Sequence, residues 1–424
     1  MKTWLQILRQ QPWKFAVAAL AFAIPSMPWF LPSLIVLIFV VTLWKQYYRQ
    51  GLGKGARRKG LIVFPLFFLF HGIGLLYTQN MEYARHDLET KSALLFLPIL
   101  MSWIPRPVLR DVYQVMLAYI AGCFTAMLEC LGVASVHWLR TGENHFFYAD
   151  LSLHQHTTYF ALYVSLAIAM AYYFLLRANR SKKGKGFYAM WVSLVVVFSG
   201  FVLMLYSKAG MATMVMVHLI TFAYFAKQRF GWWKTIVTML LITVGSSVLI
   251  YVAVPHTAYR LHLIKESLLN HDKLDKTTVE STAVRVLVWH ASKEVLKEHQ
   301  PWGTGTGDVK DELLAMYKRL GMTGALKHEL NSHNQYLQTW CALGIPGIVL
   351  LLLMLVYPFR RAIRESNYIY LVFLITFIFN LLSESMLEKQ AGVVYFAFFN
   401  AFFFFWCHAD RQPKDAISAD AQFQ

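Results

Sequence analysis

Long apolar runs recur along almost the whole chain, and they constrain its fold more than any other feature. Crossing about 30 Å of hydrocarbon takes about 20 residues of α-helix. About twelve runs approach this length, at residues 15–31, 32–44, 61–77, 92–104, 112–135, 157–176, 187–206, 210–226, 235–254, 336–357, 368–386 and 391–407. Only 15% of the 424 residues are charged and 57% are hydrophobic, which excludes an ordinary soluble domain. The sequence therefore predicts an all-α, polytopic membrane protein with about 12 transmembrane helices.

The distribution of charge predicts how the chain is oriented. Alternate segments between the runs hold 24 of the 40 Lys and Arg residues but only 5 of the 23 acids. The positive-inside rule makes these segments cytoplasmic and the polar interval 255–335 external. The basic clusters Lys54–Lys59 and Arg177–Lys185 are typical of topology signals and of contacts with anionic membrane lipids. We expect no nucleic-acid partner, because these loops are too short to build a binding domain.

Four regions follow from this topology. We expect an N-terminal transmembrane region of about nine spans at 1–254 and an external loop with amphipathic helices at 255–335. A C-terminal transmembrane region of about three spans at 336–407 and a cytoplasmic tail at 408–424 complete the chain. The first run is not expected to be a cleaved signal peptide, since a second run follows it at once without a small-residue cleavage site.

The external loop is predicted to be mainly helical. Four of its apolar residues recur at helical spacing and form one stripe: Val284, Val288, Ala291 and Val295. A second helix is predicted over 309–320, after the turn Gly303–Gly307. We expect both helices to lie on the membrane face with their apolar sides toward the lipid, which brings Arg285 to the level of the headgroups.

Arg285 and His333 are the first candidates for chemistry. Arg285 falls in the opening turns of its helix, where a guanidinium could clamp a diphosphate, although it could equally be a surface arginine that binds headgroups or a carboxylate. Asn331 or Ser332 could cap the next span and place His333 in its first turn, where the helix dipole favours a neutral imidazole. Such an imidazole can act as a general base, and the alternative is an interfacial histidine with a satisfied hydrogen bond.

Three further charged residues lie near the predicted outer surface. Lys208 stands in a tight external hairpin, where it either snorkels to the interface or serves function. Glu384 and Glu388 lie at the external end of the span 368–386 and are predicted to share a helix face. They could orient a base, pair with Arg285 or Lys208, or form a purely structural ion pair.

Two other patterns suggest ligand sites more weakly. His154 and His156 could form half of a metal site, although two such histidines more often cap a span. The turn Gly303–Gly307 is rejected as a nucleotide loop because no strand precedes it, while an anion-binding nest is left open.

Several short motifs occur in a characteristic order, mostly between Leu203 and Phe405. They are His156-Thr157-Thr158-Tyr159, Ser207-Lys208-Ala209-Gly210, Arg285 followed by Trp289, Pro301-Trp302-Gly303-Thr304-Gly305, His333-Asn334, Leu343-Gly344-Ile345-Pro346-Gly347 and Ser383-Glu384-Ser385-Met386-Leu387-Glu388. With one large, late external loop among about twelve spans, this pattern resembles the O-antigen ligase family, which is related to the O-antigen polymerases.

The resemblance implies a fold, a reaction and a place in the cell. It implies a GT-C-like glycosyltransferase that moves a glycan from undecaprenyl diphosphate to a sugar hydroxyl of lipid A–core, with inversion. The site would face the periplasm from the bacterial inner membrane and would need no metal, nucleotide or other cofactor.

The resemblance also implies roles for individual residues. Lys208 and Arg285 would bind the diphosphate, and His333 would be the catalytic base. The supporting candidates are Asn334, Glu384, Glu388 and His156. Many relatives place arginine at the position of Lys208, so its direct contact with phosphate is less well supported than that of Arg285.

Two other functions fit the same pattern. An O-antigen polymerase would use the same donor with a lipid-linked glycan as acceptor. A transporter or flippase for lipid-linked oligosaccharide would also have about twelve spans, but such folds usually carry charges at the bilayer midplane. Here Glu129 is the clearest acid inside a span, and the other polar candidates gather at one external surface.

Overall fold

All regular structure in the described part of the chain is helical. The computed structural model describes residues 11–45, 56–105, 107–178, 184–230, 274–278 and 281–406. The helices before the long α7 are α2 (Pro12–Ser26), η1 (Pro28–Phe30), α3 (Leu31–Trp44), α4 (Ala56–Ile73), η3 (Gly74–Leu76), α5 (Met81–Lys91) and α6 (Ala93–Trp103). The central helices are α7 (Leu109–Thr141), α8 (Tyr148–Leu151), α9 (Thr157–Ala178), α10 (Lys185–Met204) and α11 (Lys208–Phe230). The last are α14 (Ser281–His299), α15 (Val309–Leu320), α16 (Thr323–Lys327), α17 (Gln335–Arg364), α18 (Tyr368–Asn380), η5 (Met386–Glu388) and α19 (Gln390–Trp406).

Many of these helices are apolar enough for a membrane. Five are also long enough to cross one, and they comprise Leu109–Thr141, Thr157–Arg177, Lys185–Met204, Lys208–Ala226 and Gln335–Arg364. Shorter apolar helices of 10–17 residues occupy other predicted spans, among them Pro12–Ser26 and Tyr368–Asn380. The predicted span 235–254 and the tail 408–424 lie outside the described residues. The all-α character is confirmed in the described residues, and the five long apolar helices fit a multi-pass membrane protein, whereas the count of twelve spans stays a prediction.

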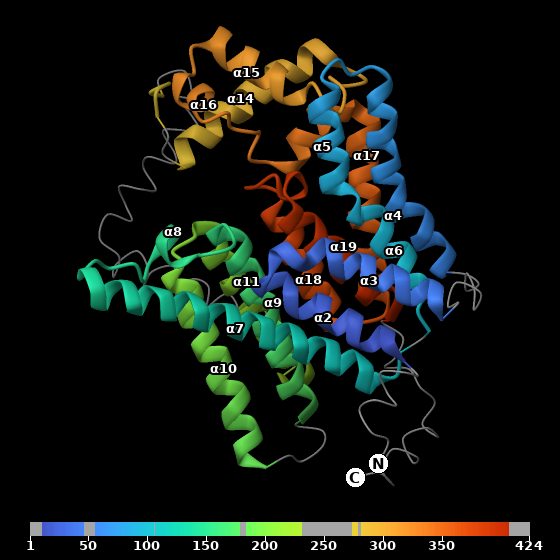
Figure 1. Cartoon of the computed structure of the whole chain (residues 1–424), viewed down its shortest axis with the longest axis vertical. Helices are drawn as coiled ribbons and strands as arrows, with labels where there is room; N and C mark the ends of the chain where they lie inside the picture. Colours follow the sequence, from blue (N-terminus) through green and yellow to red (C-terminus); the bar gives the residue numbers. More distant parts are fainter. Residues whose placement is uncertain are drawn as a thin grey trace.

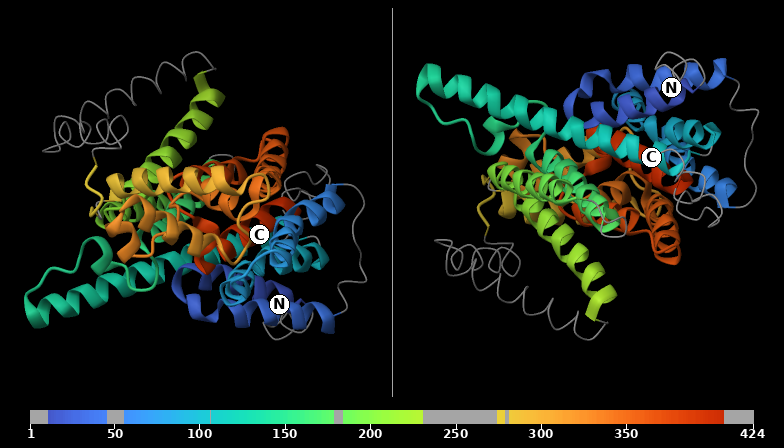
Figure 2. Two further views of the ribbon diagram at one scale, coloured as in Figure 1. Left: turned by 90° about the horizontal axis from the view of Figure 1, so that it is seen from above. Right: turned by 90° about the horizontal axis from the view of Figure 1, so that it is seen from below.

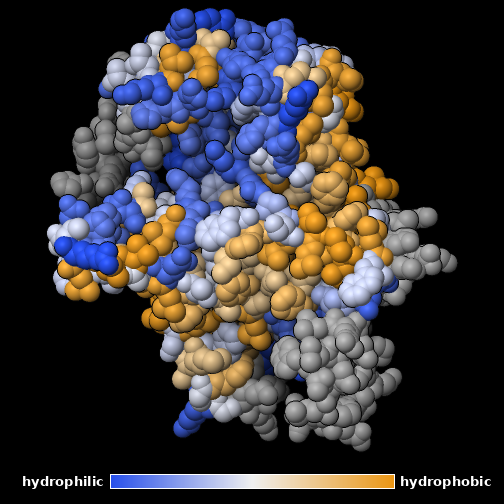
Figure 3. All heavy atoms as spheres, viewed as in Figure 1, coloured by the Kyte–Doolittle hydropathy of each residue, from blue (hydrophilic) through white to orange (hydrophobic). Residues whose placement is uncertain are grey.

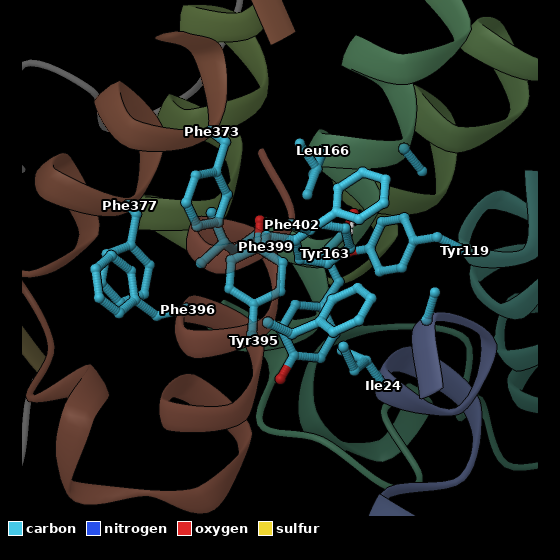
Figure 4. Packing of buried hydrophobic residues seen from close by; sticks show 14 of the residues in the cluster. Ile24, Tyr119, Tyr163, Leu166, Phe373, Phe377, Tyr395, Phe396, Phe399 and Phe402 are labelled. Atoms are coloured by element: carbon cyan, nitrogen blue, oxygen red, sulfur yellow. Dashed lines mark hydrogen bonds between the residues drawn. The ribbon is translucent and has the colours of Figure 1, made fainter. Parts of the chain in front are cut away.

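Aromatic side chains dominate the core between these helices. Tyr163 of α9 stacks on Tyr395 of α19 with ring centroids 4.8 Å apart, and Tyr119 of α7 meets Phe399 edge to face at 4.7 Å. The Tyr119 hydroxyl donates to the backbone carbonyl of Tyr163 at 2.9 Å, so its polar end is satisfied inside the apolar core. Figure 4 shows these rings converging from three helices.

The helices of the polar interval form a cap at one end of the molecule. Figure 1 shows α14, α15 and α16 stacked above the long helices, and the view from above shows α14 lying across their ends (Figure 2). Hydrophilic residues gather over this end, and hydrophobic residues cover much of the middle of the molecule (Figure 3). The predicted bounds 309–320 coincide with α15.

The apolar stripe of α14 is confirmed, but its predicted partner is wrong. Val284, Val288, Ala291 and Val295 are all buried. They belong to a second hydrophobic core that includes buried residues of α15 and the first half of α17, such as Leu343. The stripe therefore packs against protein, because two amphipathic helices that cover each other bury more apolar surface than either would alone.

Helix α17 is kinked in its first third, at Gly344. This residue has φ 63° and ψ −156°, a conformation that side chains disfavour. A Cβ there would lie 2.0 Å from the carbonyl oxygen of Pro301, so the cap and the helix approach each other closely at this point. The Ile345 N–H donates to the same Pro301 carbonyl at 2.9 Å instead of to its own helix.

At the kink, two helix carbonyls lack their usual partners in the helix and accept hydrogen bonds from the glycine-rich turn. In an uninterrupted helix, Cys341 and Ala342 would accept from residues 345 and 346. The N–H of residue 345 is diverted, and Pro346 has none to give. Their carbonyls accept instead from Thr304 at 2.8 Å and from Gly305 at 2.9 Å. The sequence thus joins the cap to α17 by backbone hydrogen bonds.

Candidate functional site

Glu384 brings the two principal candidates together. One carboxylate oxygen, Oε1, accepts a hydrogen bond from Arg285 Nη2 at 2.8 Å, and the other, Oε2, lies 3.2 Å from His333 Nδ1. The Glu384 side chain is only 10% exposed, against 22% for Arg285 and 25% for His333, so the carboxylate lies beneath its partners. Of the alternatives considered for Glu384, the structure shows the ion pair with Arg285 and the contact with His333.

The charge state of Glu384 follows from this pairing. Burial on its own raises the pKa of the carboxyl, but the His333 hydrogen bond and the charges of His333 and Arg285 outweigh it and leave the pKa below its ordinary value. The carboxylate is therefore ionised near neutral pH and can only accept hydrogen bonds. Since the carboxylate can only accept, the Nδ1 of His333 is the donor of this contact, and Nε2 is the ring nitrogen that does not face Glu384.

His333 lies just outside its helix and not in the first turn as predicted. The cap of α17 is Asn334, whose side-chain oxygen accepts from the Leu337 N–H at 3.1 Å. His333 precedes it with φ 42°, and its own N–H donates to Asn331 Oδ1 at 2.9 Å. Proposing Asn331 or Ser332 as the cap was therefore wrong. Contact with Glu384 takes the place of the helix dipole as the feature that fixes the imidazole.

Asn334 serves the backbone around the site. Besides capping α17, its side-chain amide donates to the Leu382 carbonyl at 3.1 Å, and its N–H donates to Ser385 Oγ at 3.2 Å. The Gln335 N–H donates to the Leu381 carbonyl at 2.9 Å. These bonds join the start of α17 to the segment that carries Glu384.

The sequence predicted that Glu384 and Glu388 share a helix face, and this prediction was wrong. Helix α18 ends at Asn380, Glu384 lies in the following turn, and Glu388 ends the short helix η5. Glu388 pairs with Lys91 of α5 at 3.0 Å and not with Arg285. The apolar run continues to residue 386, so hydropathy did not indicate where α18 stops.

Lys208 approaches the same helix as Arg285. Its Nζ donates to Thr282 Oγ1 at 3.1 Å, three residues before Arg285 on α14. Lys208 is exposed and is the first residue of α11. The hydroxyl of Ser207, the residue before it, forms a hydrogen bond of 3.0 Å with the hydroxyl of Thr158 in α9, which holds the hairpin in place. Gly210 allows α9 and α11 to touch, because a Cβ there would lie 2.3 Å from that of Ala161.

His156 lies within electrostatic range of the Glu384 cluster. Burial of part of its side chain lowers its pKa most, the charges of His333 and Arg285 lower it further, and Glu384 opposes them. The imidazole is therefore neutral near pH 7, although His156 is exposed as a residue. It comes from the segment before α9 and approaches the cluster independently of α14 and α17.

The two histidines predicted to form half of a metal site, His154 and His156, have different neighbours in the structure. His154 Nε2 lies 3.1 Å from Glu129 Oε1, which also gives a partner to the acid predicted to lie deep in a span. Elsewhere in the described residues, His137, Glu143 and His145 place ligand atoms within 4.8 Å of one another. The two imidazoles there stack with centroids 3.7 Å apart, so their in-plane lone pairs do not converge on one ion.

The glycine-rich turn does not form an anion nest. The N–H groups of Gly303, Thr304 and Gly305 donate to backbone carbonyls, and that of Gly307 donates to Thr78 Oγ1 at 2.9 Å. These donors are engaged within the protein, so the anion-nest alternative was wrong.

The sequence reading missed a group of buried polar residues beside the site. Lys91 and Asp87 pair on α5, and Gln335 of α17 joins them through Glu388. The spacing of Asp87 and Lys91 by four residues was visible in the external segment before residue 92. Their partners on η5 and α17 are distant in sequence and could not be inferred from it.

Part of the chain is similar to a known protein family. Residues 193–352 match the family model described as O-Antigen ligase. A curated relative from Haemophilus influenzae (strain Rd), described as an uncharacterized protein, is 24% identical over 384 residues, covering 86% of this chain and 89% of the relative. The predicted resemblance is confirmed over 193–352, a range that contains Lys208, Arg285 and His333 but not Glu384.

Proposed function

We propose, from the premise that residues 193–352 form an O-antigen ligase domain, that the protein is a membrane glycosyltransferase. It transfers a glycan from undecaprenyl diphosphate to a sugar hydroxyl of lipid A–core at the periplasmic face of the inner membrane. The observation that carries the proposal is the carboxylate of Glu384, which contacts both a guanidinium and an imidazole. A guanidinium can stabilise an anionic leaving group, and an imidazole can take the proton of a hydroxyl nucleophile.

His333 acts as the general base in this proposal. Its Nδ1–H is held by Glu384 at 3.2 Å, so Nε2 can accept the proton of the acceptor hydroxyl. A carboxylate that fixes the tautomer of a histidine and stabilises its protonated form serves the same purpose in the Ser-His-Asp triad of hydrolases. Glu384 is thus the positioning residue for His333.

Arg285 and Lys208 neutralise the diphosphate. Charge develops on the leaving group as the bond to the sugar breaks, and cations held in place stabilise it. A guanidinium has five N–H donors in one plane, so Arg285 can contact Glu384 and a phosphate oxygen together. Lys208 reaches α14 three residues away, at Thr282, and adds a second positive charge.

The reaction balances with these groups. The acceptor oxygen forms a bond to the anomeric carbon while the bond from that carbon to the diphosphate oxygen breaks. The electron pair stays on the diphosphate, and the hydroxyl proton moves to His333. Attack opposite the leaving group inverts the anomeric centre. The diphosphate already activates the sugar, so the step requires no nucleotide and, in our proposal, no metal.

An O-antigen polymerase is the nearest alternative, since domains of this family occur in both kinds of enzyme. The two differ only in the acceptor. Deleting the gene distinguishes them: loss of a ligase leaves core without O-antigen, and loss of a polymerase leaves core with a single repeat unit. A transporter of lipid-linked oligosaccharide, the remaining alternative, would move substrate without breaking the bond between sugar and diphosphate.

Transfer by the purified protein from a lipid-linked donor to defined acceptors tests the proposal. His333→Ala should lower the rate of transfer about 10²–10⁴-fold, the usual contribution of a general base. His328→Ala, at an exposed histidine of the same cap, is the matched control. Full transfer by His333→Ala in stably inserted protein would contradict the assignment, and product formed only with a lipid-linked acceptor would favour the polymerase.

A further inference from the structure

A group of charged residues is buried beside the candidate site. The buried ion cluster consists of His71, Asp87, Lys91 and Glu388, from α4, α5 and η5. Lys91 Nζ contacts Asp87 Oδ1 and lies 3.0 Å from Glu388 Oε2, while His71 Nδ1 lies 3.3 Å from Asp87 Oδ2. These side chains are between 1% and 8% exposed. Removing so many ionisable groups from water is costly, and apolar side chains of similar volume would often stabilise a fold as well.

The central pair of the cluster is charged. Burial lowers the pKa of Lys91, but Asp87 and Glu388 outweigh it and raise the pKa above its ordinary value. Burial raises the pKa of Asp87, but Lys91 and His71 outweigh it in the opposite direction. Lys91 therefore holds two carboxylates from different segments by charge-assisted hydrogen bonds, which are stronger and shorter than neutral ones.

The cluster is joined to the turn that carries Glu384. Gln335, which is fully buried, donates from Nε2 to Glu388 Oε1 at 2.9 Å and accepts at Oε1 from the Leu387 N–H. The segment 381–388 is thus held at its end by Lys91 and Gln335. Its beginning is held by the start of α17, where the Gln335 N–H donates to the Leu381 carbonyl at 2.9 Å.

We propose that Lys91 is a positioning residue for the reaction, acting through Glu388 on Glu384. The inference rests on the proposed function. Glu384 lies between the two held ends of its segment, and it must present one oxygen to Arg285 and the other to His333. Without the contact from Lys91, the Glu388 end of the segment loses its charged anchor. Glu384 then no longer satisfies both partners at once.

Lys91→Met tests this inference, because methionine keeps most of the volume and removes the charge. The kcat for glycan transfer should fall about 10–100-fold, as expected when a reacting group is misplaced by about 1 Å. The KM for the lipid-linked donor should change far less, because neither Arg285 nor Lys208 contacts Lys91. Lys310→Met is the matched control, since Lys310 forms an exposed ion pair with Glu329 at 2.6 Å.

A double-mutant cycle with Glu384→Gln separates positioning from general damage. If Lys91 acts through Glu384, adding Lys91→Met to Glu384→Gln should lower kcat no further. Additive losses, an unchanged kcat in Lys91→Met, or a KM that rises as much as kcat falls would overturn the inference. If Glu384→Gln alone retains full activity, the proposed function fails at Glu384 itself.

Glu388→Gln covers the case in which Lys91→Met does not insert or fold. This variant can keep the hydrogen bond with Gln335 and removes only the charge attracted to Lys91. It leaves Lys91 paired with Asp87, so it disturbs the buried ion cluster less. The same fall in kcat without a matching rise in KM is expected, and wild-type kinetics in correctly folded protein would overturn the inference.

Discussion

Glu384 uses its two oxygens on different partners, and this division defines the candidate site. Arg285 belongs to α14, and His333 directly precedes the cap residue of α17. The carboxylate of Glu384 contacts both side chains and so connects them. His156 approaches from the segment before α9. The residues with the strongest sequence argument thus converge on a glutamate that sequence reasoning had treated only as a supporting candidate.

Arg285→Lys should reduce transfer about 10–100-fold, because it loses a charge-assisted hydrogen bond that contributes about 1.5–3 kcal/mol. Lysine keeps the charge but cannot hold a carboxylate and a phosphate oxygen in one plane. Arg285→Ala should lose more activity than Arg285→Lys. Initial rates at saturating acceptor measure the effect. Arg319→Lys, in an exposed pair with Glu298, is the control, and equal rates for wild type and Arg285→Lys would contradict the clamp.

The lowered pKa of Glu384 predicts how its contribution to stability depends on pH. A carboxyl whose pKa is lower in the folded than in the unfolded protein stabilises the fold fully above its ordinary value of 4.5. That stabilisation is lost as the pH falls through the lowered, folded value. The difference in thermal midpoint between wild type and Glu384→Gln should therefore persist at about pH 5 and shrink below it. A difference that grows on acidification below that point would contradict the pairing.

Helix α17 serves both the cap and the membrane region. Its first turns follow the cap residue beside His333 and pack in the second hydrophobic core, and the helix as a whole is long and apolar enough to span a membrane. Gly344 and Pro346 interrupt its backbone hydrogen bonds and expose the carbonyls that bind the glycine-rich turn. The motif Leu343–Gly347 is therefore a docking point for the cap.

Gly344→Ala should destabilise the protein by about 3 kcal/mol or more, since it combines backbone strain with a collision against backbone atoms of the cap. A Cβ there would lie 2.0 Å from the Pro301 carbonyl oxygen. Thermal unfolding in detergent, followed by loss of the monodisperse peak, measures this. Gly132→Ala in α7 is the control, because no atom lies within 4 Å of its added Cβ. Equal midpoints for the two variants would contradict the close approach.

Across the whole molecule, hydropathy predicted which segments are helices but not how they pack. The bounds of α15 and the buried stripe of α14 followed from helical periodicity, because each side of an amphipathic helix has a different composition. The partner of that stripe did not follow, since periodicity says only that a face is covered. Helix α7 continues to Thr141, beyond the predicted end at residue 135, because a helix need not stop where its hydrophobic run does.

The candidate site was predicted in part. Chemistry and local pattern singled out Arg285, His333 and Lys208, but the contact between Lys91 and Glu388 joins residues 297 positions apart. No local rule predicts such a pair. The end of α18 at Asn380 also depends on a contact between residues distant in sequence. The carbonyl of Leu381, the next residue, accepts a hydrogen bond from the Gln335 N–H at the start of α17.

Sharing one carboxylate between a guanidinium and an imidazole links the two substrates of the proposed reaction. A guanidinium can contact Glu384 and a pyrophosphoryl oxygen together, while the other oxygen of Glu384 orients the imidazole toward the incoming alcohol. One side chain then aligns the leaving group with the attacking group, so its loss would uncouple donor binding from attack.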